Sequence, residues 1–473
     1  MFGVTLLKSP ADWEILQHEN GFAPVTISGI WSVPKAALEV GVKSVQPMIR
    51  LMSEEDNSPI IPWTNMSFTQ DSNEFSGMFE ITLSFPAGGL YRIETGLDTY
   101  STNPQYHWVF RGDVRLHIGV GNLFIIAGQS NSAGYGKDSA MDAPSLQVHT
   151  FRNCGRWDLA AHPLNESTYT AEERCNREMG VSGTSPYISF GRNFSTLSGY
   201  PVGLIPVALG GSPLKRWDKA QVGDLYKNMM DQLQAMETKF AGMLWYQGCS
   251  DTSQEEASRY ERVFTKFVED VRSDLGYELP IFTFQLNRQI NGTNQHCWGI
   301  VREAQRIAAI NIPGVYILPT LNCPLSDGIH NSSHSNVMLG EKLAKLCGHI
   351  LCGTRQFQAP MIASATLEYG RADTPSILLH FDSVQREFML YSDQNKDNGF
   401  LIEDALGEIA CVKVLLSAEY PNCIALLLSR KPKGACVVSF GWDACPSFIP
   451  PVDEATYLPP VAFYRYFVTQ TSA

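Results

Sequence analysis

The chain has 473 residues, of which 44% are hydrophobic and 18% charged, and its formal net charge is −12. At about 100–200 residues per domain, this length predicts two to four globular domains with apolar cores. The negative charge argues against nucleic acid and anionic membranes as partners, because both would repel such a surface. A neutral or weakly charged ligand fits the composition better.

Targeting signals and cysteine spacing indicate the compartment. The first twenty residues, MFGVTLLKSPADWEILQHEN, lack the cationic start and apolar core of a secretory signal. No apolar run approaches the roughly 20 residues that cross a bilayer. The eleven cysteines form no CxxC pair and no zinc-ligand spacing. We therefore expect a cytoplasmic protein with reduced thiols, no membrane association, and no metal or cofactor; the sequence leaves its oligomeric state open.

The expected elements fall into three regions. Residues 1–115 contain runs such as VTISGIWSV and VQPMIRLMS, whose period-two alternation between turn residues predicts an N-terminal β-sandwich-like domain. Residues 116–355 alternate buried strand-like runs (NLFIIA, VGLIPVAL, GMLWY, LPIFTFQL, VYILPT) with helical stretches. This alternation predicts a three-layer α/β/α domain with a parallel sheet. Residues 356–473 return to strand-like runs and predict a C-terminal β domain.

Polar groups follow the expected strands of the middle region. GQSN at 128–131, GGS at 210–212 and QGCSD at 247–251 each follow a strand, and DGIH at 327–330 precedes the last helix. Since ligands bind at the carboxyl ends of parallel strands, we expect these groups to converge on one edge of the sheet.

These groups supply the parts of a serine hydrolase. Ser130 is the expected nucleophile, His330 the base that takes its proton, and Asp327 the carboxylate that orients the imidazole. Taken singly, each motif is more often a turn or a helix cap than a catalytic group. Their common placement at strand ends favours the catalytic interpretation.

Donors for an oxyanion hole and contacts for substrate are also expected here. The expected oxyanion donors are the backbone N–H groups of Ser130 and Gly211 and the side-chain amide of Gln247 or Asn131. Gln129, Asn131 and Trp217 are expected to bind substrate, although Trp217 equally suits a packed aromatic. Arg302 is expected on a helix face, paired with an acidic neighbour.

The same blocks resemble a known family. GQSN, ALGGSPLKRW, WYQGCSD and DGIHNSSHSNVMLGEKLA resemble the four sequence blocks of SGNH hydrolases in order and spacing across 122–345. Together with VREAQ at 301–305, they are most similar to the sialate O-acetylesterase and acetylxylan-esterase branch, carbohydrate esterase family six. The resemblance implies a flavodoxin-like fold flanked by β domains and an acetylated carbohydrate as substrate. By position it implies the same roles for Ser130, His330, Asp327, Gly211 and Gln247.

One position departs from that branch. Where the branch usually has WxQGE, this chain has Cys249 in place of the glutamate. The Asp327–His330 pair supplies its own acid, so the expected triad is unaffected, but any support given by that glutamate is in doubt. A nucleophilic Cys249 is disfavoured, because no histidine neighbours it in the sequence.

Two other functions compete with a carbohydrate O-acetylesterase. An SGNH lipase or thioesterase would need an apolar acyl channel, which the Gln, Asn and Trp residues around the blocks do not suggest. A catalytically inactive glycan-binding protein is disfavoured by the intact serine, histidine and aspartate. Which acetylated sugar is the substrate stays open.

Overall fold

The computed structural model describes residues 3–33, 39, 41–71, 75–103, 105, 107–165, 177–178, 180–369, 374–391, 398–417 and 419–470. The chain forms two compact units. The first consists of Met1–Phe124, Ala143–Ala161 and Ser198–Ile205, and the second of Ile125–Asp142, His162–Leu197 and Pro206–Ala473. The second unit thus holds both the expected C-terminal β domain and most of the expected hydrolase domain.

The first unit is built on antiparallel strands. One sheet has the order β1 (Gly3–Lys8), β3 (Phe22–Ser32), β7 (Ser76–Pro86), β6 (Ser67–Phe68). In the other, β4 (Val42–Ser53) pairs with β5 (Pro59–Asn65) and β8 (Gly88–Ser101), and β8 pairs with β9 (Trp108–Gly128). Buried residues of both sheets, including Ile27 and Trp31 from β3 and Leu51 from β4, share one apolar core. The alternating sequence pattern therefore forms two antiparallel sheets that share this core. The short β2 (Ile15–Gln17) pairs with β9 in parallel.

The α/β sheet has the strand order β11-β10-β12-β9-β13-β14-β15. Its further strands are β10 (Val148–Phe151), β11 (Trp157–Leu159), β12 (Val202–Pro206), β13 (Gly242–Tyr246), β14 (Ile281–Phe284) and β15 (Val315–Leu318). The pairs β10–β12, β13–β14 and β14–β15 are parallel, whereas β10–β11 is antiparallel. Every residue of β12, β13 and β14 is buried, as parallel strands covered on both faces require. The predicted α/β class is confirmed. The predicted boundary after residue 115, however, falls inside β9.

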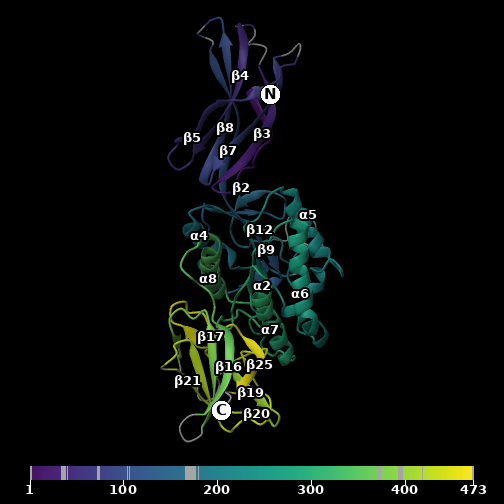
Figure 1. Cartoon of the computed structure of the whole chain (residues 1–473). Helices are drawn as coiled ribbons and strands as arrows, with labels where there is room; N and C mark the ends of the chain where they lie inside the picture. The colour runs from purple at the N-terminus through teal and green to yellow at the C-terminus, as the bar shows by residue number, and fades with distance from the viewer. Residues whose placement is uncertain are drawn as a thin grey trace. The chain divides into compact units, whose positions relative to one another are not determined.

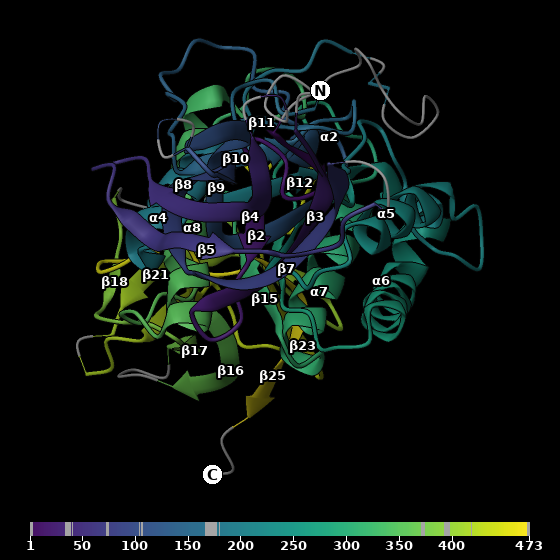
Figure 2. The ribbon, with the colours of Figure 1, turned by 90° about the horizontal axis from the view of Figure 1, so that it is seen from above.

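Helices cover this sheet. They are α2 (Ser130–Ala133), α4 (Tyr187–Ser198), α5 (Asp224–Ala235), α6 (Gln254–Leu275), α7 (Gln295–Asn311) and α8 (Ser333–Cys352). Figures 1 and 2 show α4 and α8 on one side of the sheet and α5 and α6 on the other. The helix α6 illustrates why they form: Ser253 caps its first turn by accepting from the Glu256 N–H, and Gly276 ends it with φ = 78°. Within the described ranges, no helix is both long and apolar enough to span a membrane.

The C-terminal strands form an eight-stranded sheet of order β20-β19-β23-β25-β16-β17-β22-β21. Their bounds are β16 (Met361–Tyr369), β17 (Pro375–Asp382), β19 (Phe400–Asp404), β20 (Gly407–Ile409), β21 (Cys411–Leu416), β22 (Cys423–Leu428), β23 (Cys436–Phe440) and β25 (Phe463–Gln470). A separate pair joins β18 (Phe388–Met389) to β24 (Val452–Asp453). Apolar side chains such as Leu379, Phe381 and Leu426 build the core of this region.

Candidate active site

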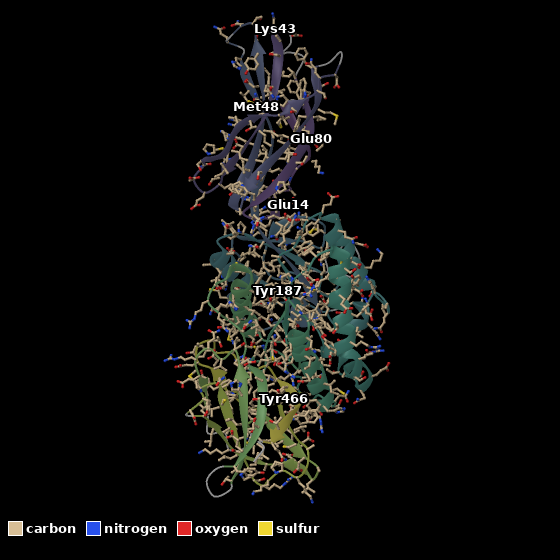
Figure 3. The ribbon with its side chains drawn as sticks, viewed as in Figure 1. Glu14, Lys43, Met48, Glu80, Tyr187 and Tyr466 are labelled. Carbon is tan, nitrogen blue, oxygen red and sulfur yellow. The ribbon has the colours of Figure 1, made fainter. Side chains whose placement is uncertain are left out.

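Ser130 stands on a sharp turn at the end of β9. Gly128 has φ = 123°, and a Cβ there would lie 2.3 Å from the carbonyl oxygen of Tyr246 on β13, so only glycine permits this approach. The N–H of Gln129 donates to the same oxygen at 2.9 Å. Behind the turn, the Ser132 hydroxyl donates to the Ala127 carbonyl at 2.9 Å and lies 2.7 Å from the hydroxyl of the buried Tyr187. Figure 3 labels Tyr187 within the second unit. The position of the Ser130 side chain is therefore fixed by the ends of two neighbouring strands.

The structure brings together the three residues of the expected triad. His330 Nε2 lies 2.9 Å from Ser130 Oγ, and His330 Nδ1 lies 2.7 Å from Asp327 Oδ2. The other oxygen of Asp327 accepts the backbone N–H groups of Ile329 and His330 at 2.9 and 2.8 Å. Burial raises the pKa of the Asp327 carboxyl, but these hydrogen bonds, the imidazole first among them, outweigh it and leave the pKa below its ordinary value. The carboxylate is thus ionised and oriented toward the imidazole.

Asn131 holds the Asp327–His330 loop against the nucleophile turn. Its Oδ1 accepts the Asn331 N–H at 2.9 Å, and its Nδ2 donates to the Ile329 carbonyl at 3.3 Å. The side chain is buried. Both ends of its amide are thus engaged within the protein, and contact of Asn131 with substrate stays a prediction. Its role is to position the loop that carries His330.

The Gly210–Ser212 turn lies beside the nucleophile turn. The Leu209 N–H donates to the Gly128 carbonyl at 3.0 Å, and the Ser212 hydroxyl donates to the Leu209 carbonyl at 2.8 Å. Gly211 is exposed and has φ = 67°. The backbone N–H groups of Gly211 and Ser130 donate to no partner in the described parts of the chain. Both therefore stay available as the predicted oxyanion donors.

Gln247 does not fit its predicted oxyanion role. It is fully buried after β13, and its Nε2 donates to the Ser212 carbonyl at 3.2 Å and to the Asp251 carboxyl. Its Oε1 accepts from the Tyr260 hydroxyl at 3.1 Å. Both amide protons are therefore used to join two strand-end loops, which contradicts the prediction. Burial raises the pKa of the partner Asp251 to about 6.

Trp217 is also misassigned by the sequence. The side chain is fully buried, packs edge-on against Trp245 at 5.3 Å and Phe267 at 6.3 Å, and donates from Nε1 to Ser212 Oγ at 3.2 Å. It offers no face to a sugar ring, so the alternative interpretation as a packed aromatic is the correct one.

The two ends of the Gln129 side-chain amide differ: the oxygen binds within the protein, and the nitrogen has no partner among the described residues. Its Oε1 accepts the Gly248 and Ser250 N–H groups at 3.0 and 3.3 Å, which anchors the loop after β13. Its amide nitrogen donates to none of the residues described in the structure. Contact of this nitrogen with substrate stays a prediction.

Tyr135, which the sequence did not single out, lies beside His330 and contacts a second such residue, Glu178. The Tyr135 ring lies 4.8 Å from the imidazole, and its hydroxyl donates to Glu178 Oε2 at 2.8 Å. Glu178 also accepts the Gly210 N–H with both oxygens, at 3.1 and 3.0 Å. Burial raises the pKa of this carboxyl above its ordinary value, although the hydrogen bonds oppose the shift. Glu178 belongs to no motif, so no sequence signal pointed to it.

Cys249 begins the 3₁₀ turn η3 (Cys249–Asp251) and is partly exposed. Burial of the sulfur raises the pKa of its thiol to about 12, so the thiolate that a nucleophile requires is scarce at neutral pH. Serine, not this cysteine, is in contact with the imidazole.

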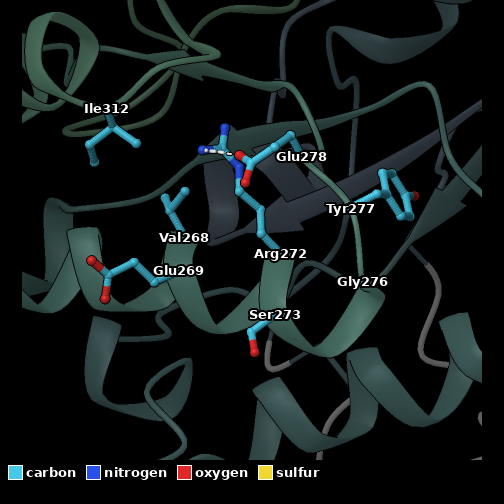
Figure 4. Close-up of a pocket in the computed structure, with 8 residues that line it drawn as sticks. All are labelled: Val268, Glu269, Arg272, Ser273, Gly276, Tyr277, Glu278 and Ile312. Atoms are coloured by element: carbon cyan, nitrogen blue, oxygen red, sulfur yellow. Dashed lines mark ion pairs between the residues drawn. The ribbon is translucent and has the colours of Figure 1, made fainter.

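Two other features bear on ligands. A hollow of about 570 Å³ at the C-terminal end of α6 is lined by residues that include Arg272 and Glu278, which form an ion pair at 3.0 Å (Figure 4). None of the expected site residues lines it. In the described parts of the chain, no group of three or more His, Cys, Asp or Glu side chains is arranged to hold a metal ion.

A sheet of mainly parallel strands, with a serine at one strand end in contact with a histidine and an aspartate of a nearby loop, is the arrangement that serine-dependent hydrolases use. Residues 120–349 match the family described as carbohydrate esterase, sialic acid-specific acetylesterase. This segment is therefore similar to that family of SGNH carbohydrate esterases, whose members are carboxylic ester hydrolases.

Two of the known proteins that are similar to this chain show how far the likeness extends. A probable carbohydrate esterase of Arabidopsis thaliana is 26% identical over 257 residues, which cover 49% of this chain and 92% of that protein. The crystal structure of a carbohydrate acetylesterase from Xanthomonas citri covers 96% of this chain and 97% of its own, with a TM-score of 0.63 and 20% identity. At this identity the second likeness shows a shared fold.

Proposed function

We propose that this carbohydrate acetylesterase hydrolyses acetyl esters on sugar hydroxyls through a triad of Ser130, His330 and Asp327. The observation that carries the proposal is the position of the His330 imidazole, which contacts the serine hydroxyl on one side and the aspartate on the other, at 2.9 and 2.7 Å. This is the geometry that a general base needs in order to activate a serine.

The reaction follows from these contacts. His330 Nε2 takes the Ser130 proton as Oγ attacks the acetyl carbonyl, while Asp327 stabilises the imidazolium. The negative oxygen of the tetrahedral intermediate accepts from the N–H groups of Ser130 and Gly211. The imidazolium then gives its proton to the departing sugar oxygen, which leaves an acetyl-serine. Water, activated by the same imidazole, attacks this ester, and acetate is released as Ser130 regains its proton.

The match of residues 120–349 to a carbohydrate esterase family favours an acetylated carbohydrate over a long-chain lipid or a thioester. The contact between Ser130 and His330 argues against an inactive glycan-binding protein. We propose that a short O-acetylated oligosaccharide is the substrate and that the glycosidic bonds stay intact. A typical glycosidase needs two carboxylates that flank the bond. The proposed triad contains only one.

Two assays test the proposal. In the first assay, 4-nitrophenyl acetate should be hydrolysed faster than 4-nitrophenyl octanoate. With acetylated xylo-, manno- and sialo-oligosaccharides, mass spectrometry should show losses of single acetyl units at constant chain length. Shortened chains, or preference for octanoate with no deacetylation of any sugar, would contradict it.

A further inference from the structure

Arg302 on α7 is almost fully buried and is held by backbone carbonyls, not by the acidic neighbour expected from the sequence. Its Nε donates to Leu286 at 3.0 Å and its Nη2 to Asn287 at 2.5 Å. Its Nη1 donates to Gly441 at 2.7 Å and Asp443 at 2.5 Å. Burial lowers the pKa of this arginine to about 10, so it stays protonated at neutral pH.

These carbonyls belong to two segments far apart in the sequence. Leu286 and Asn287 follow β14 of the α/β sheet, whereas Gly441 and Asp443 follow β23 of the C-terminal sheet. The same two regions meet again where the Gln289 N–H donates to the Ala444 carbonyl at 2.7 Å.

Further contacts join α7 and β14 to the C-terminal sheet. The buried Gln285 side chain exchanges two hydrogen bonds with the Ala462 backbone, at 2.8 and 2.9 Å. The helix α7 packs against β25, and Figure 1 shows the two side by side. A buried polar junction of this kind has few alternative arrangements, because each displaced group would lose its partner.

Residues 286–290, here named the bridge segment, are hydrogen-bonded to the loop that carries Asp327 and His330. Asn287 Nδ2 donates to Asn331 Oδ1 at 2.6 Å, and the Ile290 N–H donates to the Gly328 carbonyl at 2.8 Å. Asn331 directly follows His330, and Gly328 directly follows Asp327. The bridge segment therefore contacts both ends of the loop that carries the catalytic histidine and aspartate.

We propose that the C-terminal β region positions the Asp327–His330 loop for catalysis, and that Arg302 links the two through the bridge segment. The inference rests on the proposed function, since it assigns a role in that mechanism. Arg302 is a positioning residue: it touches neither substrate nor the reacting atoms. Without its guanidinium, three buried carbonyls and the partly buried carbonyl of Asp443 lose this donor, and the bridge segment is free to shift together with His330.

The test compares two buried arginines on the same helix. Arg306 lies one turn after Arg302, pairs with Glu303 at 2.6 Å and lies over the ring of Tyr466 on β25, 5.8 Å from its centroid. It makes no hydrogen bond to the bridge segment in the described structure. Arg306→Met is therefore the matched control for Arg302→Met, because both remove a buried arginine between α7 and the C-terminal sheet.

Hydrolysis of 4-nitrophenyl acetate and thermal unfolding are measured for each variant. In Arg302→Met we expect kcat to fall about 10- to 100-fold with little change in KM, because misplacing a reacting group by about 1 Å has an effect of this size. Arg302→Lys should recover part of the loss. Arg306→Met should lower the melting temperature and leave kcat near that of the wild type.

Wild-type kcat in folded Arg302→Met, or an equal loss of kcat in Arg306→Met, would overturn the inference. If Arg302→Met does not fold, the variant Asn287→Ser tests the link between the bridge segment and the catalytic loop. It removes the side-chain amide that binds Asn331 and keeps the backbone carbonyl that binds Arg302. A reduced kcat supports the link, and an unchanged kcat refutes it. Should Ser130→Ala remain active, the proposed function itself fails; an inactive Ser130→Ala beside a fully active Arg302→Met refutes this inference alone.

Discussion

The ring of Tyr135 lies over the imidazole of His330, with the ring centroids 4.8 Å apart and the planes at 33°. The same tyrosine donates to Glu178, which in turn accepts the N–H of Gly210 next to the predicted oxyanion donor Gly211. One buried carboxyl thus contacts both the residue that packs on the base and the turn that carries an oxyanion donor.

Glu178→Gln should lower kcat and stability together. The groups bonded to the carboxyl, from Tyr135, Gly210 and Asn165, are all donors, and glutamine replaces one accepting oxygen with a further donor. Leaving such a buried group unsatisfied costs about 1–3 kcal/mol. We expect a loss of this size in urea unfolding and a fall in kcat for acetyl ester hydrolysis. Tyr135→Phe, which keeps the ring, should have the smaller effect on kcat.

The stability of the same variant should depend on pH. Burial raises the pKa of Glu178, so the folded state binds its proton more tightly than the unfolded chain does. That contribution to stability is complete below the unfolded pKa of about 4.3 and is lost as pH rises through the folded pKa. The stability advantage of the wild type over Glu178→Gln should therefore be larger at pH 4.5 than at pH 7. An advantage that grows with pH would show that the direction of the shift is wrong.

Ser130→Ala should abolish ester hydrolysis, with kcat reduced by about 10⁴ to 10⁶. Ser132→Ala is its control, since this neighbouring hydroxyl binds the Ala127 carbonyl and the Tyr187 hydroxyl behind the turn. It should cost stability and retain most of the activity. Circular dichroism confirms folding of both variants. Near-normal turnover by folded Ser130→Ala would exclude this residue as the nucleophile.

Trp217→Phe should affect stability and not substrate binding. The indole is fully buried and donates to Ser212, so its replacement removes packing and one hydrogen bond. We expect a destabilisation of about 1–3 kcal/mol, measured by urea unfolding, with KM for acetylated oligosaccharides unchanged. A markedly raised KM at unaltered stability would restore the role in sugar binding that the structure contradicts.

Cys249→Ala should retain activity, and iodoacetamide should not inactivate the wild type at pH 7.5. Burial raises the pKa of this thiol to about 12, so almost none of it is the reactive thiolate. The exposed Cys154 serves as the labelling control, and its alkylation is followed by mass spectrometry. Loss of activity in step with modification of Cys249 would argue for a thiol in the mechanism.

The sequence by itself determined the α/β class and predicted the three residues that meet beside the nucleophile turn. Both follow from local sequence patterns. Buried strand-like runs alternate with amphipathic helices, GQSN directly follows a strand, and DGIH lies in the loop before the last helix. The parallel arrangement then determines where the loops that follow the strands meet, because parallel strands bring their carboxyl ends to one edge of the sheet. The sequence alone therefore predicted the contact between Ser130 and His330, which lie 200 residues apart in the chain.

Only the tertiary structure decided what the neighbouring polar and aromatic residues do. Gln247 and Trp217 stand in the right motifs, but α6 covers them with Tyr260 and Phe267, so their polar groups serve the core. Burial depends on which distant segment packs on a residue, and residue type does not encode it. The same holds for Arg302, whose partners Gly441 and Asp443 lie about 140 residues away and become neighbours only when the C-terminal sheet packs against α7.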